Sequence, residues 1–223
     1  MAMMGLHAGY GLFPRWRNAA LVLAVMLVTL APLLAASVRA AELRVLALGD
    51  SLTAGYNLPA DAAFPAQLEK ALRGKGVQAR VINAGVSGDT TAGGLARLDW
   101  ALADRPSHAL VALGANDMLR GLSPEQAKAN LDRIVARLKQ EGVKVMLVGM
   151  LAAPNLGADY GGRFNAIFPD LAKKHDVPLY PFFLDEVASN PKLNLGDGLH
   201  PNREGVAIMV RKMLPQILGF LGS

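Results

Sequence analysis

The sequence predicts an α/β protein built on a parallel β-sheet. From Leu43 onward, short apolar runs alternate with amphipathic stretches, which is the pattern of repeated strand–helix units. Runs of branched apolar residues that close on glycine are typical of buried parallel strands. We therefore expect five strands, over residues 43–48, 77–83, 108–113, 143–150 and 177–181.

Helices are expected between and after these strands, over residues 65–73, 91–103, 124–141, 163–174 and 203–218. Ser123 and Gln126 form a capping box at the start of the third helix, with proline at its first position. Pro169 should kink the fourth helix or mark its true start. Asn202 caps the last helix, and residues 182–196 are expected to be irregular.

The amino terminus has the order of a secretory signal peptide. Arg15 and Arg17 precede an apolar segment over residues 19–36, and Val38-Arg39-Ala40 follows with small residues at the positions a cleavage site needs. The alternative is an uncleaved membrane anchor, because 18 apolar residues reach the lower limit for a spanning helix. Since Pro32 interrupts this run, we predict a signal peptide over residues 1–40, cleaved after Ala40, and a periplasmic or secreted protein.

The remaining residues, 41–223, are expected to form one domain with a full core and no stable membrane span. Removing three arginines from the 23 basic residues leaves 20 against 18 acidic residues, so the net charge falls from +5 to +2. No long basic run is left that would indicate a nucleic-acid partner. The chain has no cysteine, which excludes a thiol nucleophile and a thiolate metal site.

The first strand ends at Gly49-Asp50-Ser51-Leu52. Ligands of open α/β sheets bind outside the carboxyl ends of the strands, so Ser51 is placed as a nucleophile would be. A turn followed by a helix cap would use the same residue types. The tetrapeptide alone does not decide between these interpretations.

Three histidines follow the predicted cleavage site, and topology separates them. His108 opens the third strand and His175 precedes the fifth, so both are expected at the amino-terminal edge of the sheet as surface or helix-end histidines. His200 alone follows the carboxyl end of a strand. Asp197 lies three residues earlier and can fix the histidine tautomer, which would give a triad of Ser51, His200 and Asp197. Taken alone, this turn also fits a polar loop before a helix.

Two further loops offer donors for the oxyanion that an acyl transfer generates. The backbone N–H of Ser51, the loop residue Gly88 and the side-chain amide of Asn116 are the candidates, although each alone also fits turn chemistry. We expect Asp50, Met118, Leu119 and Leu151 beside the substrate, with Asp50 mainly holding the turn. The apolar groove could include other residues that are equally core candidates: Leu122, Met150, Phe164 and Phe168.

Four ordered blocks of the chain resemble those of the SGNH (GDSL) hydrolases: Gly49-Asp50-Ser51-Leu52, Ser87-Gly88-Asp89, Gly114-Ala115-Asn116-Asp117 and Asp197-Gly198-Leu199-His200. Residues 83–90, 94–98, 116–121 and 200–203 are most similar to its periplasmic branch of acyl-CoA thioesterase I, arylesterase and lysophospholipase. The resemblance implies a flavodoxin-like three-layer α/β/α sandwich with strand order 2-1-3-4-5. It also implies Ser51 as nucleophile, Gly88 and Asn116 in the oxyanion hole, and Asp197 with His200 as relay. The segment Ala152–Ala158 departs from the family pattern, which leaves the preferred acyl length open.

The sequence therefore predicts a monomeric serine esterase or thioesterase that works through an acyl-enzyme without cofactor or metal. Its small-molecule substrates would be aryl esters, lysophospholipids or acyl-CoA thioesters. One alternative is a metal-dependent phosphoesterase, with a cation held by Asp50, Asp89, Asn116, Asp117, Asp197 and His200. A carbohydrate O-deacetylase would be expected to offer aromatic platforms, and aromatic residues make up only 6% of the chain. A binding module with an inert pocket is the non-enzymatic alternative.

Overall fold

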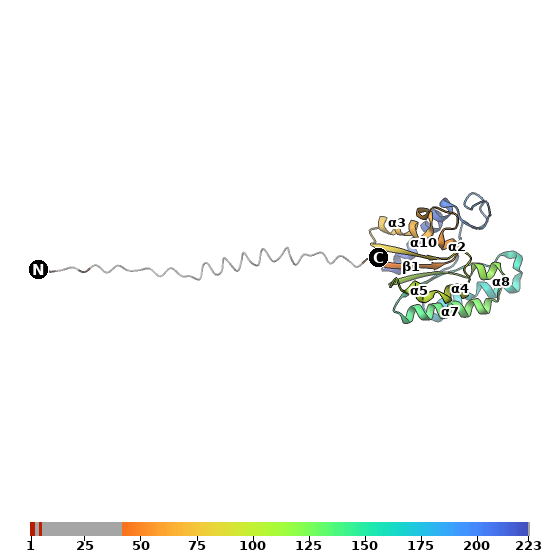
Figure 1. Cartoon of the computed structure of the whole chain (residues 1–223), viewed down its shortest axis with the longest axis horizontal. Helices are drawn as coiled ribbons and strands as arrows, with labels where there is room; N and C mark the ends of the chain where they lie inside the picture. The colour runs from red at the N-terminus through yellow and green to blue at the C-terminus, as the bar shows by residue number, and fades with distance from the viewer. Residues whose placement is uncertain (3–4, 6–41, 223) are drawn as a thin grey trace. The chain divides into compact units, whose positions relative to one another are not determined.

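The computed structural model describes residues 1–2, 5 and 42–222 (Figure 1). The predicted cleavage site after Ala40 and most of the predicted signal peptide lie outside the described residues. The chain divides after Ala40, and the description below concerns the unit Ala41–Ser223.

A five-stranded parallel sheet forms the centre of this unit, in the order β2-β1-β3-β4-β5. Gly49 at the end of β1 is in register with Gly85 of β2 and Ala112 of β3. The carboxyl ends of β2, β1 and β3 therefore lie side by side at the same edge of the sheet. The strands are β1 (Leu43–Gly49), β2 (Ala79–Gly85), β3 (His108–Ala112), β4 (Lys144–Val148) and β5 (Leu179–Tyr180).

Helices cover both faces of the sheet, and this confirms the predicted three-layer α/β/α sandwich (Figure 1). One face carries α2 (Ser51–Ala54), α3 (Phe64–Gly74) and α10 (Arg203–Leu221). The other carries α4 (Thr91–Ala96), α5 (Leu98–Leu102), α7 (Pro124–Gln140) and α8 (Ala158–Asn165), with α9 (Ile167–His175) packed against α7. Short elements complete the chain: η1 (Ala60–Ala62), α6 (Ala115–Leu119) and η2 (Pro154–Leu156).

The middle strands are buried on both sides, as a parallel sheet between two helical layers requires. From Val45 to Gly49 every residue of β1 is buried, and β3 is buried over its first four residues. The near-continuous apolar runs of the sequence therefore predict the buried strands well. The edge strand β5 is only two residues long, shorter than expected.

Two of the predicted helices are each divided in two. The predicted helix over 91–103 breaks at Arg97 into α4 and α5, because Gly93 and Gly94 weaken the helix and the Arg97 side chain turns toward the sheet. The predicted helix over 163–174 is interrupted at Ala166, and Pro169 lies in the first turn of α9, where proline is tolerated. The second of these helices begins at Ile167, so Pro169 lies near its start, close to one of the two expected outcomes.

Predicted caps are present at two helix starts. Ser123 Oγ accepts a hydrogen bond from Gln126 N at 3.3 Å. This is one half of the predicted capping box; no bond from Ser123 N to the Gln126 side chain is formed among the described residues. Asn202 Oδ1 accepts from the backbone N–H groups of Glu204 and Gly205, both at 3.0 Å. Each of these side chains satisfies N–H groups that the first turn of a helix leaves without a backbone partner.

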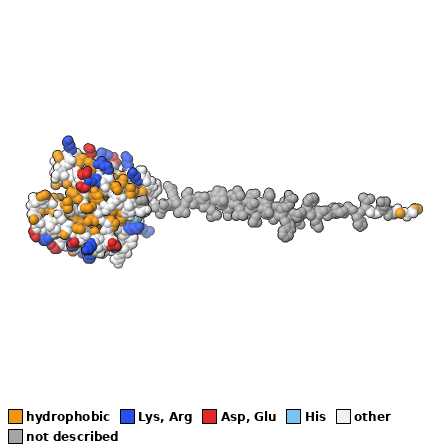
Figure 2. Space-filling view, turned by 180° about the vertical axis from the view of Figure 1, so that it is seen from behind, with side chains coloured by type: hydrophobic (Ala, Val, Ile, Leu, Met, Phe, Trp, Pro, Cys, Tyr) orange, Lys and Arg blue, Asp and Glu red, His pale blue; other side chains and the backbone are white. Residues whose placement is uncertain are grey.

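The surface of the unit mixes charges of both signs. On the face seen in Figure 2, Lys and Arg side chains lie beside Asp and Glu side chains, with hydrophobic side chains between them. This face offers no single-sign field of the kind that attracts a polyanion. Within the described part of the chain, no helix has both the length and the apolar character needed to cross a bilayer.

Candidate active site

Ser51 is the first residue of α2, directly after the end of β1. Asp50 is the N-cap, and its Oδ1 accepts a hydrogen bond from Leu52 N at 3.0 Å. Two glycines allow this one-turn helix to lie close against the strand ends: a Cβ on Gly49 would collide with the Thr53 side chain, and one on Gly85 with the Ala54 backbone. The position of Ser51 is therefore fixed by backbone packing.

His200 joins Ser51 to Asp197 in a continuous hydrogen-bonded chain. His200 Nε2 lies 2.9 Å from Ser51 Oγ, and His200 Nδ1 lies 2.7 Å from Asp197 Oδ2. A carboxylate accepts only, so the bond to Asp197 assigns the ring proton to Nδ1 and leaves Nε2 free to accept the serine proton. The three predicted triad residues are thus brought together in the order that general-base activation of a serine needs.

Asp197 is held in place by the backbone of its own loop. Its Oδ1 accepts hydrogen bonds from Leu199 N at 2.9 Å and from His200 N at 3.0 Å. These backbone donors, together with the His200 ring, lower the pKa of Asp197 to about 2. The carboxylate is therefore ionised across the whole neutral range and can stabilise an imidazolium.

Gly88 and Asn116 lie in the loops that follow β2 and β3. Gly88 has φ +83°, and its carbonyl accepts a hydrogen bond from Arg120 Nη2 at 2.7 Å. Its N–H has no hydrogen-bond partner among the described residues. Asn116 belongs to α6 and lines the same pocket as Ser51. Gly88 and Asn116 thus follow the two strands that flank β1, the strand that precedes Ser51.

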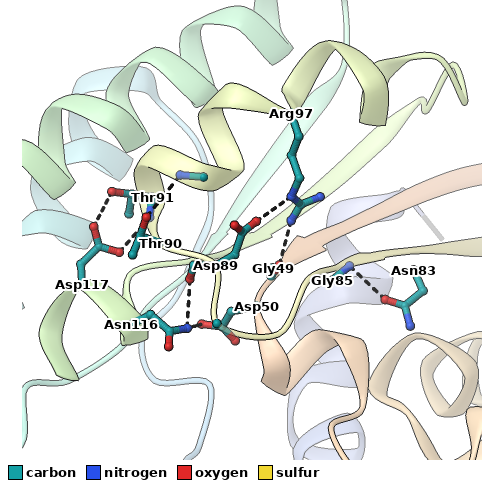
Figure 3. Close-up of polar contacts among 12 residues, drawn as sticks. Gly49, Asp50, Asn83, Gly85, Asp89, Thr90, Thr91, Arg97, Asn116 and Asp117 are labelled. Atoms are coloured by element: carbon teal, nitrogen blue, oxygen red, sulfur yellow. Dashed lines mark hydrogen bonds and ion pairs between the residues drawn. The ribbon is translucent and has the colours of Figure 1, made fainter. Parts of the chain in front are cut away.

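A network of partly buried polar contacts ties these loops together (Figure 3). Arg97 Nε lies 2.6 Å from Asp89 Oδ2, and Arg97 Nη2 donates to Gly49 O at 3.0 Å. Asn116 Nδ2 donates to Asp89 O at 2.9 Å and lies 3.4 Å from Asp50 Oδ2. Arg97 therefore connects the loop that carries Gly88 to the residue before Asp50.

A second contact fixes α4 against α6. Asp117 accepts hydrogen bonds from Thr91 N at 2.8 Å and from Thr91 Oγ1 at 2.6 Å, and Asn130 Nδ2 donates to the same hydroxyl at 3.1 Å. Figure 3 shows Asp117 and Thr91 beside the Asn116 contacts. Arg97 and Thr91 were not predicted as part of the site, because Gly49 and Asp117, to which they bond, lie 48 and 26 residues away in the sequence.

Asp50 is almost completely buried, at 1% exposure. Burial raises the pKa of its carboxyl group to about 6, against the lowering effect of the Leu52 N–H and of His200. Its oxygens face Leu52 N and the Asn116 amide. This position supports the turn-holding role rather than direct contact with a substrate.

Beside Ser51 lies a mainly apolar pocket with a volume of about 130 Å³. Met118 and Leu119, expected beside the substrate, line it together with Met150. Leu151 does not line it and is 45% exposed, while Phe164 and Phe168 belong to the buried core. Leu184 and Leu199 also line the pocket, from a segment without regular structure in which no periodicity could reveal them. The lining residues are Ser51, Leu52, Ala115, Asn116, Met118, Leu119, Met150, Leu184, Leu199 and His200.

Three carboxylates that the metal-dependent alternative would use as ligands each have a different partner. Asp89 pairs with Arg97, Asp117 with Thr91, and Asp197 with His200. Within the described residues, no three His, Cys, Asp or Glu side chains are grouped so that they could hold a metal ion. The arrangement around Ser51 instead suits acyl transfer.

The other two histidines lie at the amino-terminal edge of the sheet. His108 is buried at 4% exposure and packs edge-on against Phe220 of α10, so its prediction as a surface or helix-end histidine was wrong. Its Nδ1 lies 2.9 Å from Ser107 Oγ, and burial lowers its pKa. His175 is the last residue of α9, and its Nε2 lies 2.6 Å from Asp132 Oδ1.

The sheet order, the helical layers and the Ser51–His200–Asp197 chain define an acylhydrolase of the SGNH type. Residues 47–208 match the GDSL-like Lipase/Acylhydrolase family, and the chain belongs to this family. The resemblance predicted from the four sequence blocks is confirmed, and so is the class of enzyme, a hydrolase of ester bonds.

Named relatives are similar over most of the chain. An arylesterase of Vibrio mimicus is 42% identical over 77% of this chain and 86% of its own length. The thioesterase 1/protease 1/lysophospholipase L1 of Escherichia coli strain K12 is also 42% identical, over 78% of this chain and 82% of its own. The crystal structure of AlinE4, an SGNH-hydrolase family esterase, superposes with a TM-score of 0.68 at 48% identity, covering 80% of this chain and 96% of that one.

Proposed function

We propose that Ser51 is the nucleophile of this esterase, that His200 is its general base and acid, and that Asp197 orients and stabilises the histidine. The observation that carries the proposal is the pair of hydrogen bonds on one imidazole ring, 2.9 Å to Ser51 Oγ and 2.7 Å to Asp197 Oδ2. No other histidine of the described chain is bonded to both a serine and a carboxylate.

In the first half of the reaction, His200 Nε2 takes the Ser51 proton as Oγ attacks the acyl carbon. The resulting oxyanion is bound by the N–H groups of Ser51 and Gly88 and by the Asn116 amide. The imidazolium then gives its proton to the leaving alcohol or thiol, and the acyl group stays on Ser51. In the second half His200 deprotonates a water molecule that attacks the acyl-enzyme, and the carboxylic acid leaves with Ser51 restored.

The names of the relatives support aryl esters, thioesters and lysophospholipids as substrate types. The pocket supports a narrower proposal about the acyl group. A dry apolar cavity of about 150 Å³ holds a benzene molecule, which has six heavy atoms. Because the pocket beside Ser51 is about 130 Å³, we infer a preference for acyl groups of about four to six carbons.

A graded panel of p-nitrophenyl esters and acyl-CoA thioesters, with acyl chains from two to sixteen carbons, tests the proposed substrate types and the inferred acyl length. We expect kcat/KM to be highest near four to six carbons and to be the same with and without EDTA. A continuous rise toward the longest chains would contradict the inferred acyl preference, and loss of activity in EDTA would favour the metal-dependent alternative.

We further propose that residues 1–40 are a cleaved export signal and that the mature enzyme is a monomer in the periplasm or outside the cell. The basic, apolar and small-residue order of residues 15–40 supports this location. Expression of the full chain in a Gram-negative host, followed by cell fractionation and amino-terminal sequencing, should give a periplasmic protein that begins at Ala41. Its elution volume in size-exclusion chromatography should correspond to one copy of residues 41–223. A cytoplasmic protein that retains Met1 would contradict the export proposal.

A further inference from the structure

Tyr56 lies against the face of the His200 ring. The centroids of the two rings are 4.4 Å apart and their planes are inclined by 34°. Tyr56 is 40% exposed, so the contact is at the mouth of the site and not in the core. The mechanism described above gives this aromatic residue no role.

The backbone of Tyr56 is hydrogen-bonded to the backbone of Ser51, the proposed nucleophile. Gly55 N and Tyr56 N both donate to Ser51 O, at 3.1 and 3.2 Å. Gly55 adopts φ +83° as the C-cap of α2, and a Cβ there would collide with Ala63. The one-turn helix α2 therefore places Ser51 at its start and Tyr56 just beyond its end, which fixes the tyrosine relative to the nucleophile.

His200 comes from a loop outside the helices and strands, and its side chain is 22% exposed. The bonds to Ser51 and Asp197 hold the two nitrogens at the edge of the ring. In an acyl-enzyme, Ser51 Oγ is esterified and no longer has a proton to donate to Nε2. The contact with Tyr56 on the ring face does not depend on that proton.

We propose that Tyr56 is a positioning residue for His200. Its aromatic face keeps the imidazole oriented toward Ser51 and stabilises the imidazolium that forms in each half of the reaction. This inference rests on the proposed roles of Ser51 and His200. A cation within about 6 Å of an aromatic centroid is attracted by the negative face of the ring, and this distance condition is met here.

Two carboxylates also act on the His200 ring. Asp197 is hydrogen-bonded to it from the same loop, and Asp50 faces the site from the N-cap of α2 and interacts with His200 electrostatically. Among the described residues, the ring also has a hydrogen bond to Ser51 Oγ and a ring contact with Tyr56. Tyr56 therefore adds a contact on the ring face to the hydrogen bonds that Ser51 and Asp197 make at the ring edge.

The test compares Tyr56→Leu with Tyr56→Phe in the mature chain. Phenylalanine keeps the aromatic face and loses only the hydroxyl group, whereas leucine keeps a similar bulk without the face. Trp100→Leu is the matched control, since Trp100 is a 68% exposed aromatic residue on α5. Each protein is followed by kcat and KM across pH on a short-chain p-nitrophenyl ester, and by NMR titration of the His200 ring without substrate.

We expect Tyr56→Leu to lower kcat about two- to fivefold and to move both the acidic limb of kcat/KM and the NMR midpoint about 0.3 to 0.7 pH units lower, because the imidazolium loses a stabilising contact. Tyr56→Phe and Trp100→Leu should match the wild type. An unchanged NMR midpoint in Tyr56→Leu, or a Tyr56→Phe variant as impaired as Tyr56→Leu, would overturn the proposal. If the midpoint moves as expected while the wild type hydrolyses no ester, the ring contact stands and the proposed function fails.

Discussion

The two edges of the sheet hold the same kinds of side chain in different combinations. At the amino-terminal edge, Ser107 Oγ lies 2.9 Å from His108, and His175 lies 2.6 Å from Asp132. At the carboxyl edge, one histidine contacts both a serine and an aspartate. The amino-terminal edge therefore has one serine–histidine pair and a separate histidine–aspartate pair. At the carboxyl edge, a single histidine belongs to both kinds of pair.

Each half at the amino-terminal edge lacks what a catalytic site needs. His108 Nε2 is buried, and among the described residues it has no hydrogen-bond partner. Asp132 is shared by His175 and Lys174, whose Nζ lies 2.8 Å away, so its charge is already compensated. A serine–histidine pair or a histidine–aspartate pair alone is thus weak support for catalysis. What distinguishes the carboxyl edge is that the loops after the strands bring the serine, the histidine and the aspartate together.

The largest expected effect is the difference in kcat between variants of Ser51 and of Ser107. Ser51→Ala should lower kcat on a short-chain p-nitrophenyl ester by about 10⁴-fold or more, because the nucleophile is lost. Ser107→Ala should keep kcat within about twofold, since among the described residues that hydroxyl is hydrogen-bonded only to His108 and the Arg44 backbone. Circular dichroism and the melting temperature would establish that both variants are folded. Comparable losses in the two variants would contradict the distinction between the edges.

The two histidines bonded to carboxylates provide the next comparison. His200→Ala should reduce kcat nearly as much as Ser51→Ala, because serine and histidine act as one unit. His175→Ala should leave kcat close to the wild-type value and affect only the melting temperature. Asp197→Asn should be less damaging than His200→Ala, since the loop is also held by the bond from Leu195 N to His200 O. Steady-state kinetics of the three variants would check this order, and an inactive, folded His175→Ala would contradict it.

An intermediate effect is expected from the oxyanion donor. Asn116→Ala should lower kcat about 10²- to 10³-fold with a smaller change in KM, because the amide is needed mainly when the oxyanion develops. Asn130→Ala is its matched control: Asn130 bonds Thr91 in the neighbouring network and does not line the pocket. Equal losses of kcat in the two variants would indicate that the network, and not the donor, limits turnover.

The smallest expected effect concerns stability and pH. The pKa of Asp50 is raised to about 6 by burial, so its protonation stabilises the folded state. This contribution is fully present below pH about 4 and is lost as the pH rises through about 6; it amounts to about 3 kcal/mol at most. Asp50→Asn cannot titrate, so the difference in unfolding free energy between wild type and variant should change over this range. If urea titrations gave the same difference in unfolding free energy from pH 4 to 7, the raised pKa of the buried Asp50 carboxyl group would be contradicted.

Much of the site could be predicted from the sequence because strand ends have a local signal. Ser51, Gly88, Asn116 and His200 each follow a strand of the sheet or the irregular segment beyond it, and parallel strands place such residues at one edge. The α/β class was predicted from the alternation of apolar runs and amphipathic stretches, and the family and strand order from the resemblance of four sequence blocks; all three are confirmed.

The errors and omissions concern contacts between distant parts of the chain. His108 is buried because Phe220, 112 residues later, covers it, and no local pattern indicates that contact. Leu184 and Leu199 come from a segment without helix or strand period, and Leu151 was expected in a groove that they line instead. Tyr56 contacts His200 only because Gly55 ends α2 after a single turn.

Labelling with a serine-directed p-nitrophenyl phosphonate tests the central claim most directly. Mass spectrometry of the intact protein should show one phosphonyl group, and peptide mapping should place it on Ser51, with labelling lost in His200→Ala. The phosphonate should leave the peptide that carries Ser107 unmodified. An adduct on Ser107 or another residue, or an active enzyme that takes up no phosphonate, would contradict the assignment of Ser51 as the nucleophile.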